Sequence, residues 1–575
     1  MMDLTDSEII SAGNFANVMG VSKATLQKWE ENGTFVPHTD VSGRKFFFLN
    51  ELMHVPEIKA MAQSSWNEEM QTRPLRDFLS IELFAGGGGL ALGMEKAGFK
   101  HVMLNEFDKS ACETLRQNRP DWNVVEGDVC QINFASWKEK VDFISGGFPC
   151  QAFSYAGKGA GFDDARGTLF FQLARAVKEV RPKVFMGENV RGLAAHDNGR
   201  TLQVIKGVIK ELGYTLVEPH VLKAICYMVP QKRERLFLIA IRNDYADKVN
   251  FEWPSPYKRV MTLRDAFFAG ELYDTDVPCS PCQKYPAKKQ RVMEMVPEGG
   301  DWRDLPVEVQ KEYMGASFYL GGGKTGMARR LSLDEPSLTL TCSPAQKQTE
   351  RCHPTETRPL SVREYARIQT FPDDWQFAGN LSAQYKQIGN AVPVNLAWAM
   401  GRALMRLMNQ IELIDRGIAI PPKRNEPFRH GIHYHTPEGE FVQLSLFEPG
   451  HVYLSADKTM LIGTCRQATR PWIDAHQQYN YPIAKEDLDL HPELRNVKRL
   501  VLTYRKSVIG YFDVKGVQVV GREELARLDY PVKSSRHKAD MQYLLYTLEK
   551  RNDDVPIFDG GFQIITGRGT NFSST

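Results

Sequence analysis

Short apolar runs alternate with longer amphipathic segments between residues 78 and 243 of the chain. The clearest apolar runs lie at 79–84, 102–105, 143–145, 184–187 and 236–240, and each is short enough to be a buried strand. The segments between several of these runs have helical character. Strands that alternate with helices in this way predict an α/β sheet that is covered by helices on both faces.

The first sixty residues have a different pattern, which is typical of a small helical unit. A predicted helix at 14–19 ends at Gly20, and Ser22 is placed to cap a second helix in which Leu26 and Trp29 face inward. A turn at 42–45 and an extended segment at 46–48 complete the outline of a winged helix-turn-helix. This outline resembles the DNA-binding head of MerR-type regulators, and the alternative is a purely structural cap. The DNA contacts expected on the wing are Arg44 and Lys45.

The remaining segments differ from one another in composition. Residues 61–77 are polar and predict a linker, whereas residues 250–355 are rich in Pro, Gly and Lys and have weak periodicity. Residues 358–410 return to a helical pattern that predicts core packing. After a break at 421–424 comes a separate α+β module, which is β-rich around 508–520. Its closing segment is expected to be a helix, because the helical spacing is met by Met541, Leu544, Leu545 and Leu548.

The bulk composition bounds the class of protein without identifying it. A chain of 575 residues is too long for one core, and its net charge of +2 neither requires nor excludes a nucleic-acid partner. No apolar run reaches eighteen residues and no secretory signal is visible, so we expect neither a membrane span nor export. Nine scattered cysteines suit a reducing compartment. These features favour a multidomain protein of the cytoplasm.

A glycine-rich segment at 81–89 is the first candidate for a ligand site. A buried strand that runs into four glycines and then a helix allows the backbone to approach a ligand closely. Glu106 stands where a ribose-binding acid is expected, and Asp128 follows the next predicted strand. These features alone fit an NAD enzyme as well as one that uses S-adenosylmethionine.

The segment at 146–154 separates these alternatives, because Cys150 follows a proline at the end of a predicted strand. Glu188 closes another strand and is expected at the same edge of the sheet. Before the last strand, Gln231, Arg233 and Arg235 project from one face if that stretch is extended. A thiol, an acid and two arginines at successive strand ends predict a catalytic site.

At this point the chain resembles the bacterial DNA cytosine-5 methyltransferase family from about residue 79 to residue 404. Its blocks occur in the family's order, and they are Phe84-x-Gly86-x-Gly88, Pro149-Cys150-Gln151, Glu188-Asn189-Val190, Gln231-x-Arg233-x-Arg235 and Gly389-Asn390-Ala391-Val392-Pro393. Residues 358–372 resemble a further block. One departure is Glu82, where many relatives have aspartate, and no loss of activity is expected from it.

The resemblance implies a Rossmann-like S-adenosylmethionine-dependent sheet and a division into regions. It gives a catalytic domain at 78–250 that resumes at 358–410 and a small target-recognition region at 251–357, and outside its range the pattern of the first residues gives a helix-turn-helix domain at 1–60. An accessory domain of unknown function is expected at 425–575. The expected partners are double-stranded DNA and a cognate restriction endonuclease, in a bacterial or phage-encoded restriction-modification system.

The resemblance also assigns roles to residues, and no metal is required. The catalytic set is Cys150, Glu188, Asn189, Arg233 and Arg235. The cofactor set is Phe84, Gly86, Gly88, Glu106, Asp128, Pro149, Asn390 and Val392. The DNA contacts in the catalytic region are Gln151, Ser154 and Gln231. In this scheme the Cys150 thiolate attacks a cytosine that has been flipped out of the duplex.

Three other interpretations stay open. Some relatives with this active site modify tRNA, and the N-terminal unit could also regulate transcription of the protein's own operon. A nuclease fused at the C-terminus rests only on Asp513-Val514-Lys515. An accessory domain that binds DNA or a partner is preferred there, and its basic stretch comprises Arg495, Lys498, Arg499, Arg505 and Lys506.

Zinc binding is a weaker possibility, suggested by Cys279 and Cys282. Further ligands would have to come from Cys342, Cys352 and His353, but these residues lack the close spacing of a second ligand pair. The absence of a zinc site is therefore favoured.

Overall fold

The computed structural model describes residues 9–418 except 42, 149–168 and 320–324. In the C-terminal part it describes residues 452–455, 460–464, 473, 475–484, 492–504, 507–528, 541–550 and 562–565. The chain divides into two compact units, Met1–Gly431 and Ile432–Thr575. None of the described helices is both long and apolar enough to cross a membrane.

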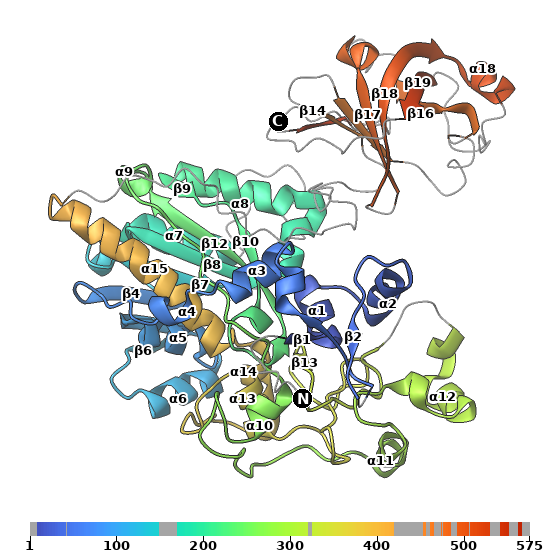
Figure 1. Ribbon diagram of the computed structural model, residues 1–575. Helices are drawn as coiled ribbons and strands as arrows, with labels where there is room; N and C mark the ends of the chain where they lie inside the picture. The colour runs from blue at the N-terminus through green and yellow to red at the C-terminus, as the bar shows by residue number, and fades with distance from the viewer. Residues whose placement is uncertain are drawn as a thin grey trace. The chain divides into compact units, whose positions relative to one another are not determined.

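A mixed sheet lies at the centre of the first unit, with the strand order β10-β12-β8-β7-β4-β5-β6, and β9 pairs with β12 (Figure 1). The strands are β4 (Phe78–Leu83), β5 (Phe99–Glu106), β6 (Val124–Glu126), β7 (Phe143–Gly147), β8 (Val184–Val190), β9 (Tyr214–Leu216), β10 (His220–Lys223) and β12 (Glu234–Arg242). Strands β4 to β8 are parallel, and β12 is antiparallel to β8. All five predicted strands are confirmed.

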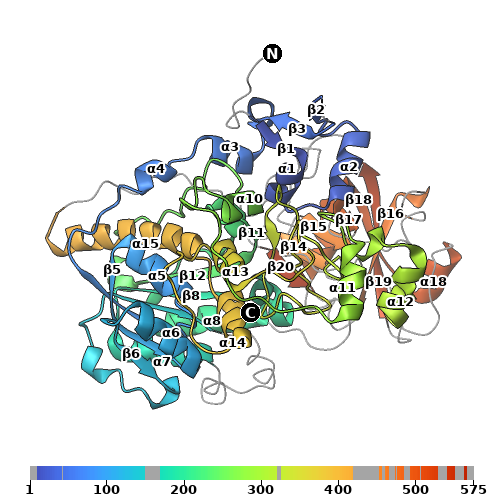
Figure 2. The same cartoon turned by 90° about the horizontal axis from the view of Figure 1, so that it is seen from below.

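Helices cover both faces of this sheet, as the sequence predicts. Helices α5 (Gly89–Ala97) and α15 (Val394–Asp415) pack on one face, and α7 (Leu169–Val180) and α8 (Arg200–Glu211) pack on the other (Figure 2). Helix α6 (Lys109–Asn118) follows β5. The contact between α5 and α15 depends on Gly93, since a Cβ atom there would lie 2.3 Å from the Cβ atom of Ala397.

The strand order reverses between β4 and β7. After β4 the chain builds outward through β5 and β6, and then it returns to place β7 on the other side of β4. In open sheets of this kind, ligands bind outside the carboxyl ends of the strands at the point of reversal. The glycine segment follows β4 and the segment that contains Cys150 follows β7, so both begin at this point.

The N-terminal unit has the predicted helices and a three-stranded sheet in the order β1-β3-β2. Its elements are β1 (Ile9–Ser11), α1 (Ala12–Met19), α2 (Lys23–Glu31), β2 (His38–Thr39), β3 (Lys45–Phe48) and α3 (Pro56–Ala62). The Ser22 side chain accepts from the Thr25 N–H and caps α2, and Leu26 and Trp29 are buried, as predicted. The unit packs against Ile225 and Val260.

The linker predicted at 61–77 is more ordered than expected. Helix α4 (Trp66–Glu69) lies within it, and the Trp66 side chain is 2% exposed in the main core. Arg402 stacks over the Trp66 ring, with 4.0 Å between its guanidinium carbon and the ring centre. The prediction of a linker followed from the polar composition of the segment. A single large aromatic ring is nevertheless enough to dock a short segment on the core.

Residues 251–357 form few regular elements, in keeping with their weak periodicity. They are α10 (Leu263–Phe267), α11 (Ala287–Glu294), α12 (Val307–Met314) and β13 (Ser337–Leu338). Strand β13 pairs in parallel with β11 (Gln231–Lys232). The chain then returns to the main core through α13 (Val362–Ile368), α14 (Leu381–Asn390) and α15.

The described residues of the second unit form a seven-stranded sheet in the order β16-β19-β18-β17-β15-β14-β20. Its elements are β14 (Val452–Ser455), β15 (Met460–Thr464), β16 (Gln478–Ala484), β17 (Arg499–Tyr504), β18 (Ser507–Val520), α18 (Arg522–Arg527), β19 (Met541–Lys550) and β20 (Phe562–Ile565). The predicted closing helix is wrong, because these residues form β19. Consecutive residues from Tyr543 to Tyr546 are buried between β16 and β18, so both faces are apolar and the alternation typical of a strand is missing.

Candidate active site

The glycine loop after β4 has a backbone that few side chains tolerate. Phe84, Gly86 and Gly88 have positive φ angles of 61°, 55° and 87°, respectively. At Gly89, where α5 begins, a Cβ atom would lie 2.3 Å from the carbonyl oxygen of Val392. The loop therefore needs glycine for its turn and for the close approach of the segment before α15. It leaves backbone groups at the sheet edge where a ligand can approach.

Glu106 ends β5 beside this loop, and its carboxylate is held by backbone N–H groups. Gly86 N–H donates to Oε2 at 2.7 Å, while the N–H groups of Phe107 and Asp108 donate to Oε1 at 2.8 and 2.7 Å. Two carboxylate oxygens have about four acceptor positions, so capacity is left for a hydroxyl donor. This geometry fits the ribose-binding role that the resemblance implies.

Phe107 is a candidate for contact with the cofactor that no sequence motif indicated. Its side chain is 76% exposed directly after Glu106, which is unusual for so large an apolar ring. Its position one residue after the predicted ribose acid was the available signal.

Asp128 lies at the carboxyl end of the next strand and caps a short 3₁₀ turn, Val129–Gln131. The Cys130 N–H donates to its Oδ1 at 2.9 Å, and this bond lowers the pKa of the Asp128 carboxyl. The carboxylate is exposed, so the cap and a ligand contact are compatible.

Glu188 and Arg235 form a buried ion pair at the end of the sheet, 2.6 Å from Oε1 to Nε. The strand register brings the two side chains together. Glu188 of β8 lies opposite Phe237 of the antiparallel strand β12, and Arg235, two residues from Phe237, projects from the same face. Burial raises the pKa of Glu188, although the two arginines Arg235 and Arg233 oppose this effect. A Cβ atom on Gly147 would lie 2.9 Å from Glu188 Oε2, so the glycine leaves room for the carboxyl group.

Asn189 braces the chain next to the predicted nucleophile. Its Nδ2 donates to the Phe148 carbonyl at 2.6 Å, and its Oδ1 accepts from the Val190 N–H at 2.8 Å. Phe148 is the last described residue before the gap at 149–168. Four predicted site residues lie outside the described residues, and they are Pro149, Cys150, Gln151 and Ser154.

Arg233 is buried between two segments that are distant in the sequence. Its two terminal nitrogens donate to the Leu340 carbonyl at 3.1 Å and to the Gly389 carbonyl at 2.9 Å. It therefore joins the segment that follows β13 to the segment before α15. Asn390 is exposed at this point, and the Cys342 thiol donates to its Oδ1 at 3.2 Å.

Two predicted contacts differ from the structure. The Val392 side chain is 6% exposed and packs in the main core, so a cofactor contact is open only to its backbone. Gln231 is 0% exposed, and both ends of its amide are bonded within the protein. Its expected DNA contact is therefore not available in this structure. Alternation along a strand predicts which side chains share a face, but not which face is buried.

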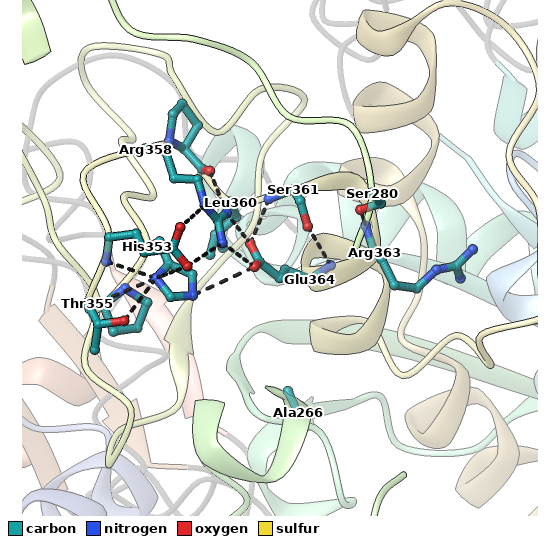
Figure 3. Close-up of polar contacts among 12 residues, drawn as sticks. Ala266, Ser280, His353, Thr355, Arg358, Leu360, Ser361, Arg363 and Glu364 are labelled. Atoms are coloured by element: carbon teal, nitrogen blue, oxygen red, sulfur yellow. Dashed lines mark hydrogen bonds and ion pairs between the residues drawn. The ribbon is translucent and has the colours of Figure 1, made fainter. Parts of the chain in front are cut away.

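The block at 358–364 is a compact polar cluster centred on Glu364 (Figure 3). Arg358 donates to both carboxylate oxygens of Glu364, at 2.7 and 2.9 Å, and the Ser361 N–H donates to Oε2 at 2.7 Å. The Glu364 N–H donates to Ser361 Oγ, which completes a capping box at the start of α13. The cluster fixes the start of α13.

The remaining candidates are the predicted DNA contacts on the N-terminal wing and the suggested zinc ligands. On the N-terminal wing, Lys45 pairs with Glu30 at 2.6 Å and Arg44 lies 3.6 Å from Asp40. Of the proposed zinc ligands, Cys352 is buried and its thiol donates to the Glu356 carbonyl, whereas Cys279 is exposed. Within the described part of the chain, no three metal-binding side chains come together.

Comparison with known proteins agrees with this geometry. The profile of the family described as C-5 cytosine-specific DNA methylase matches residues 78–406. The Type II methyltransferase M.Eco47II of Escherichia coli is 60% identical over 405 residues, which cover 70% of this chain and 97% of that protein. The Type II methyltransferase M.PspPI of a Psychrobacter species is 59% identical over 400 residues, covering 69% and 96%.

A third relative, the Type II methyltransferase M.Sau96I of Staphylococcus aureus, is 51% identical over 345 residues. These cover 59% of this chain and 78% of that protein. The ordered motifs, the glycine loop at the reversal of the sheet and the buried acid–arginine pair fit the same family. The chain belongs to the C-5 cytosine-specific DNA methylase family and is a DNA (cytosine-5)-methyltransferase, an enzyme class that uses S-adenosylmethionine.

Proposed function

We propose that the protein methylates C5 of one cytosine within a short DNA sequence, through a covalent adduct on Cys150. Cytosine C5 is a poor nucleophile, so the ring must first become electron-rich. The Cys150 thiolate adds to C6, which forms an S–C bond and moves an electron pair toward C5. After methylation, loss of the C5 proton and cleavage of the S–C bond restore the ring and the thiol.

The Glu188–Arg235 pair is the single observation that carries this proposal. A buried carboxyl with a raised pKa can hold a proton for N3 of the base, and protonation of N3 draws charge into the ring as the adduct forms. Arg235 is placed to bond the cytosine carbonyl oxygen while it holds the acid in position. Asn189 donates to the carbonyl of Phe148, and Cys150 follows two residues later in the sequence. Because consecutive Cα atoms are about 3.8 Å apart, the chain keeps Cys150 close to Phe148.

The cofactor residues fit an adenosyl group. Glu106 has acceptor capacity for ribose hydroxyls, Asp128 is exposed for the adenine amino group, and Phe84 and Phe107 offer ring faces. Backbone groups of the loop at Gly86 and Gly88, together with Pro149, Asn390 and the Val392 backbone, would complete the pocket. When bound, S-adenosylmethionine supplies the methyl group.

We further infer that residues 251–357 read the DNA sequence and that residues 151–168, which include Gln151 and Ser154, contact the extruded base. The target atom is inaccessible inside a stacked duplex, so the base must leave it. Support for the recognition role comes from the position of this region between the arginine block and α13, and from its irregular, loop-rich structure. Double-stranded DNA is accordingly the proposed substrate.

The relatives' names support a Type II modification role, in which methylation protects DNA from a cognate endonuclease. A cytoplasmic location in a bacterium, or in a phage-infected cell, follows from that role. The match to the C-5 cytosine-specific DNA methylase family favours a DNA substrate over the alternative of tRNA.

DNA contact by the N-terminal unit is a second proposal, supported by the exposed residues of α2, which include Gln27 and Lys28. Arg44 and Lys45 on the wing both have acidic neighbours, so we expect this contact to add little to the affinity for DNA. Regulation of an operon by this unit would therefore require a specific DNA site. For the C-terminal module we prefer a role in DNA or partner binding. There, Arg495, Lys498 and Arg499 are exposed, and Lys515 pairs with Glu549.

Trapping with a fluorinated base tests the proposed chemistry. If C5 of the target cytosine carries fluorine, the final loss of a proton is blocked, so the S–C6 bond persists. The purified protein should then form a complex with fluorocytosine-containing DNA that survives denaturing electrophoresis and requires S-adenosylmethionine. Cys150→Ser should form none, and a complex of equal yield in that variant would contradict the assignment.

A further inference from the structure

Two buried glutamines connect the recognition region with the segment that packs on the glycine loop. Gln231 in β11 and Gln369 at the end of α13 are both 0% exposed. Gln231 Nε2 donates to Gln369 Oε1 at 2.8 Å. At its other end, Gln231 Oε1 accepts from the Leu340 N–H at 2.9 Å, two residues after β13 of the recognition region. One side of the pair is therefore attached to the recognition region.

The other side of the pair is attached to the junction of α14 and α15. Gln369 Nε2 donates to the Ile388 carbonyl at 2.6 Å and to the Ala391 carbonyl at 3.1 Å. The Gln369 carbonyl accepts from the Val394 N–H at 2.9 Å. These bonds surround Asn390, which the family resemblance places in the cofactor pocket. Figure 2 shows β11, α13 and α14 close together at this junction.

Arg233 forms a second connection between the same two segments. It donates to the Leu340 carbonyl and to the Gly389 carbonyl, so the backbone of Leu340 is held by Gln231 on one side and by Arg233 on the other. A Cβ atom on Gly389 would lie 2.1 Å from the Thr341 carbonyl oxygen. Segments 339–342 and 388–391 are in close contact and cannot slide past each other freely.

We propose that Gln231 and Gln369 are positioning residues that couple DNA docking on the recognition region to cofactor binding at the sheet edge. Each described amide end has a protein partner, so displacing one segment alone leaves a buried polar group without a bond, which is unfavourable. A shift of 339–342 on binding DNA is therefore passed to 388–391. This inference rests on the proposed function, because it assumes that 251–357 bind DNA.

The test measures coupling by calorimetry on the full-length protein. The Kd of S-adenosylhomocysteine is measured alone and with a duplex taken from plasmid DNA that the wild-type enzyme methylates. DNA should tighten this binding in the wild type by about 5- to 150-fold, the usual range for coupled sites. In Gln231→Met and in Gln369→Met the ratio should fall to within about twofold of one. The double variant should lose no more than either single variant, because the two act as a unit.

Gln410→Met is the matched control. Gln410 also accepts from one backbone N–H and donates to one carbonyl, both of Asn250, at 2.8 and 2.9 Å, and it lies in the C-terminal half of α15. It should keep the wild-type ratio. If Gln231→Met does not fold by circular dichroism, Gln231→Glu replaces it, since this variant keeps the acceptor for Leu340 and presents a carboxyl oxygen to Gln369 Oε1 in place of the amide donor.

The outcomes separate the two proposals. An unchanged ratio in folded Gln231 and Gln369 variants, or a ratio of one in the wild type, overturns the coupling. Methylation by the wild type alongside an unchanged ratio leaves the enzymatic function intact. Absence of any DNA methylation by the wild type contradicts the proposed function itself.

Discussion

At the scale of single residues, two buried carboxyl groups of the central sheet have raised pKa values. Glu188 faces the arginines at the sheet edge, while Glu82 lies inside β4, where Ser145 Oγ donates to it at 3.4 Å. Burial is the largest cause for both, and it raises the pKa of Glu82 to about 8. Only Glu188 is placed to meet a base, so the two groups should respond differently to substitution.

Glu188→Gln should lower kcat by about 100- to 10,000-fold, the usual contribution of a general acid. The wild-type rate should fall as pH rises through the raised pKa of Glu188, because the proton for N3 is then lost. Steady-state methylation across pH checks both points. The same alkaline decline in residual activity of the variant would contradict the assignment to Glu188.

Glu82→Gln should stabilise the protein at high pH. Between pH 4.5 and about 8 the unfolded chain has lost this proton and the folded protein keeps it, so the wild-type free energy of unfolding falls as pH rises. Each pKa unit corresponds to about 1.4 kcal/mol, and glutamine cannot ionise. Thermal unfolding at pH 5 and pH 8 should show the variant's advantage growing with pH, and a constant difference would refute this.

The sequence motifs indicate which residues lie at the sheet edge better than they indicate what surrounds those residues. Glu188, Asn189 and Arg235 occupy one edge because the first two close β8 and Arg235 lies at the start of β12, which is antiparallel to β8. Burial of Gln231 was not predictable, since its partners Leu340 and Gln369 are over a hundred residues away. Phe107 was missed because no motif containing it was considered.

At the scale of elements, α5 and α15 are held together by glycines. A Cβ atom on Gly93 would meet Ala397 and Trp398, and one on Gly401 would lie 2.6 Å from the Cβ atom of Ala97. Because packed helices cannot separate without losing contacts, this face of the sheet depends on small side chains at the crossing.

Gly93→Ala should therefore destabilise the protein by about 1–3 kcal/mol, the usual cost of overpacking. Gly207→Ala in α8 is the control, since a Cβ atom there has open space around it and should stabilise by about 0.4–1 kcal/mol. Urea unfolding of the two variants and the wild type measures both effects. Equal changes in the two variants would show that close packing is not the cause.

The wrong prediction for residues 541–548 belongs to this scale. Helical spacing of four apolar residues was counted, but Tyr543 and Tyr546 were not, and with them the segment is apolar on both faces. A fully buried strand and a buried helix cannot be told apart by periodicity alone. The strand at 508–520 was predictable because it is rich in β-branched residues and charged residues flank it on both sides.

At the scale of the whole molecule, the active-site edge lies entirely within the first unit. M.Eco47II is matched over 97% of its length by 70% of this chain, so about three tenths of the chain has no counterpart in that relative. The sequence break at 421–424 predicted a separate C-terminal module, but nothing in its composition indicated its role.

A chain that ends after Ile418 should therefore fold and methylate DNA with a kcat within a few-fold of the full-length protein. Its circular dichroism should keep the α/β signal while losing strand content. Loss of activity in a folded, truncated protein would show that the second unit takes part in the reaction.

The most direct test of the central claim is methylation of mixed-sequence duplex DNA with labelled S-adenosylmethionine, followed by bisulfite sequencing. The account predicts C5 methylation of cytosine in one short motif by the wild type and none by Cys150→Ser. Label on tRNA without label on DNA, or methylation that persists in Cys150→Ser, would contradict it.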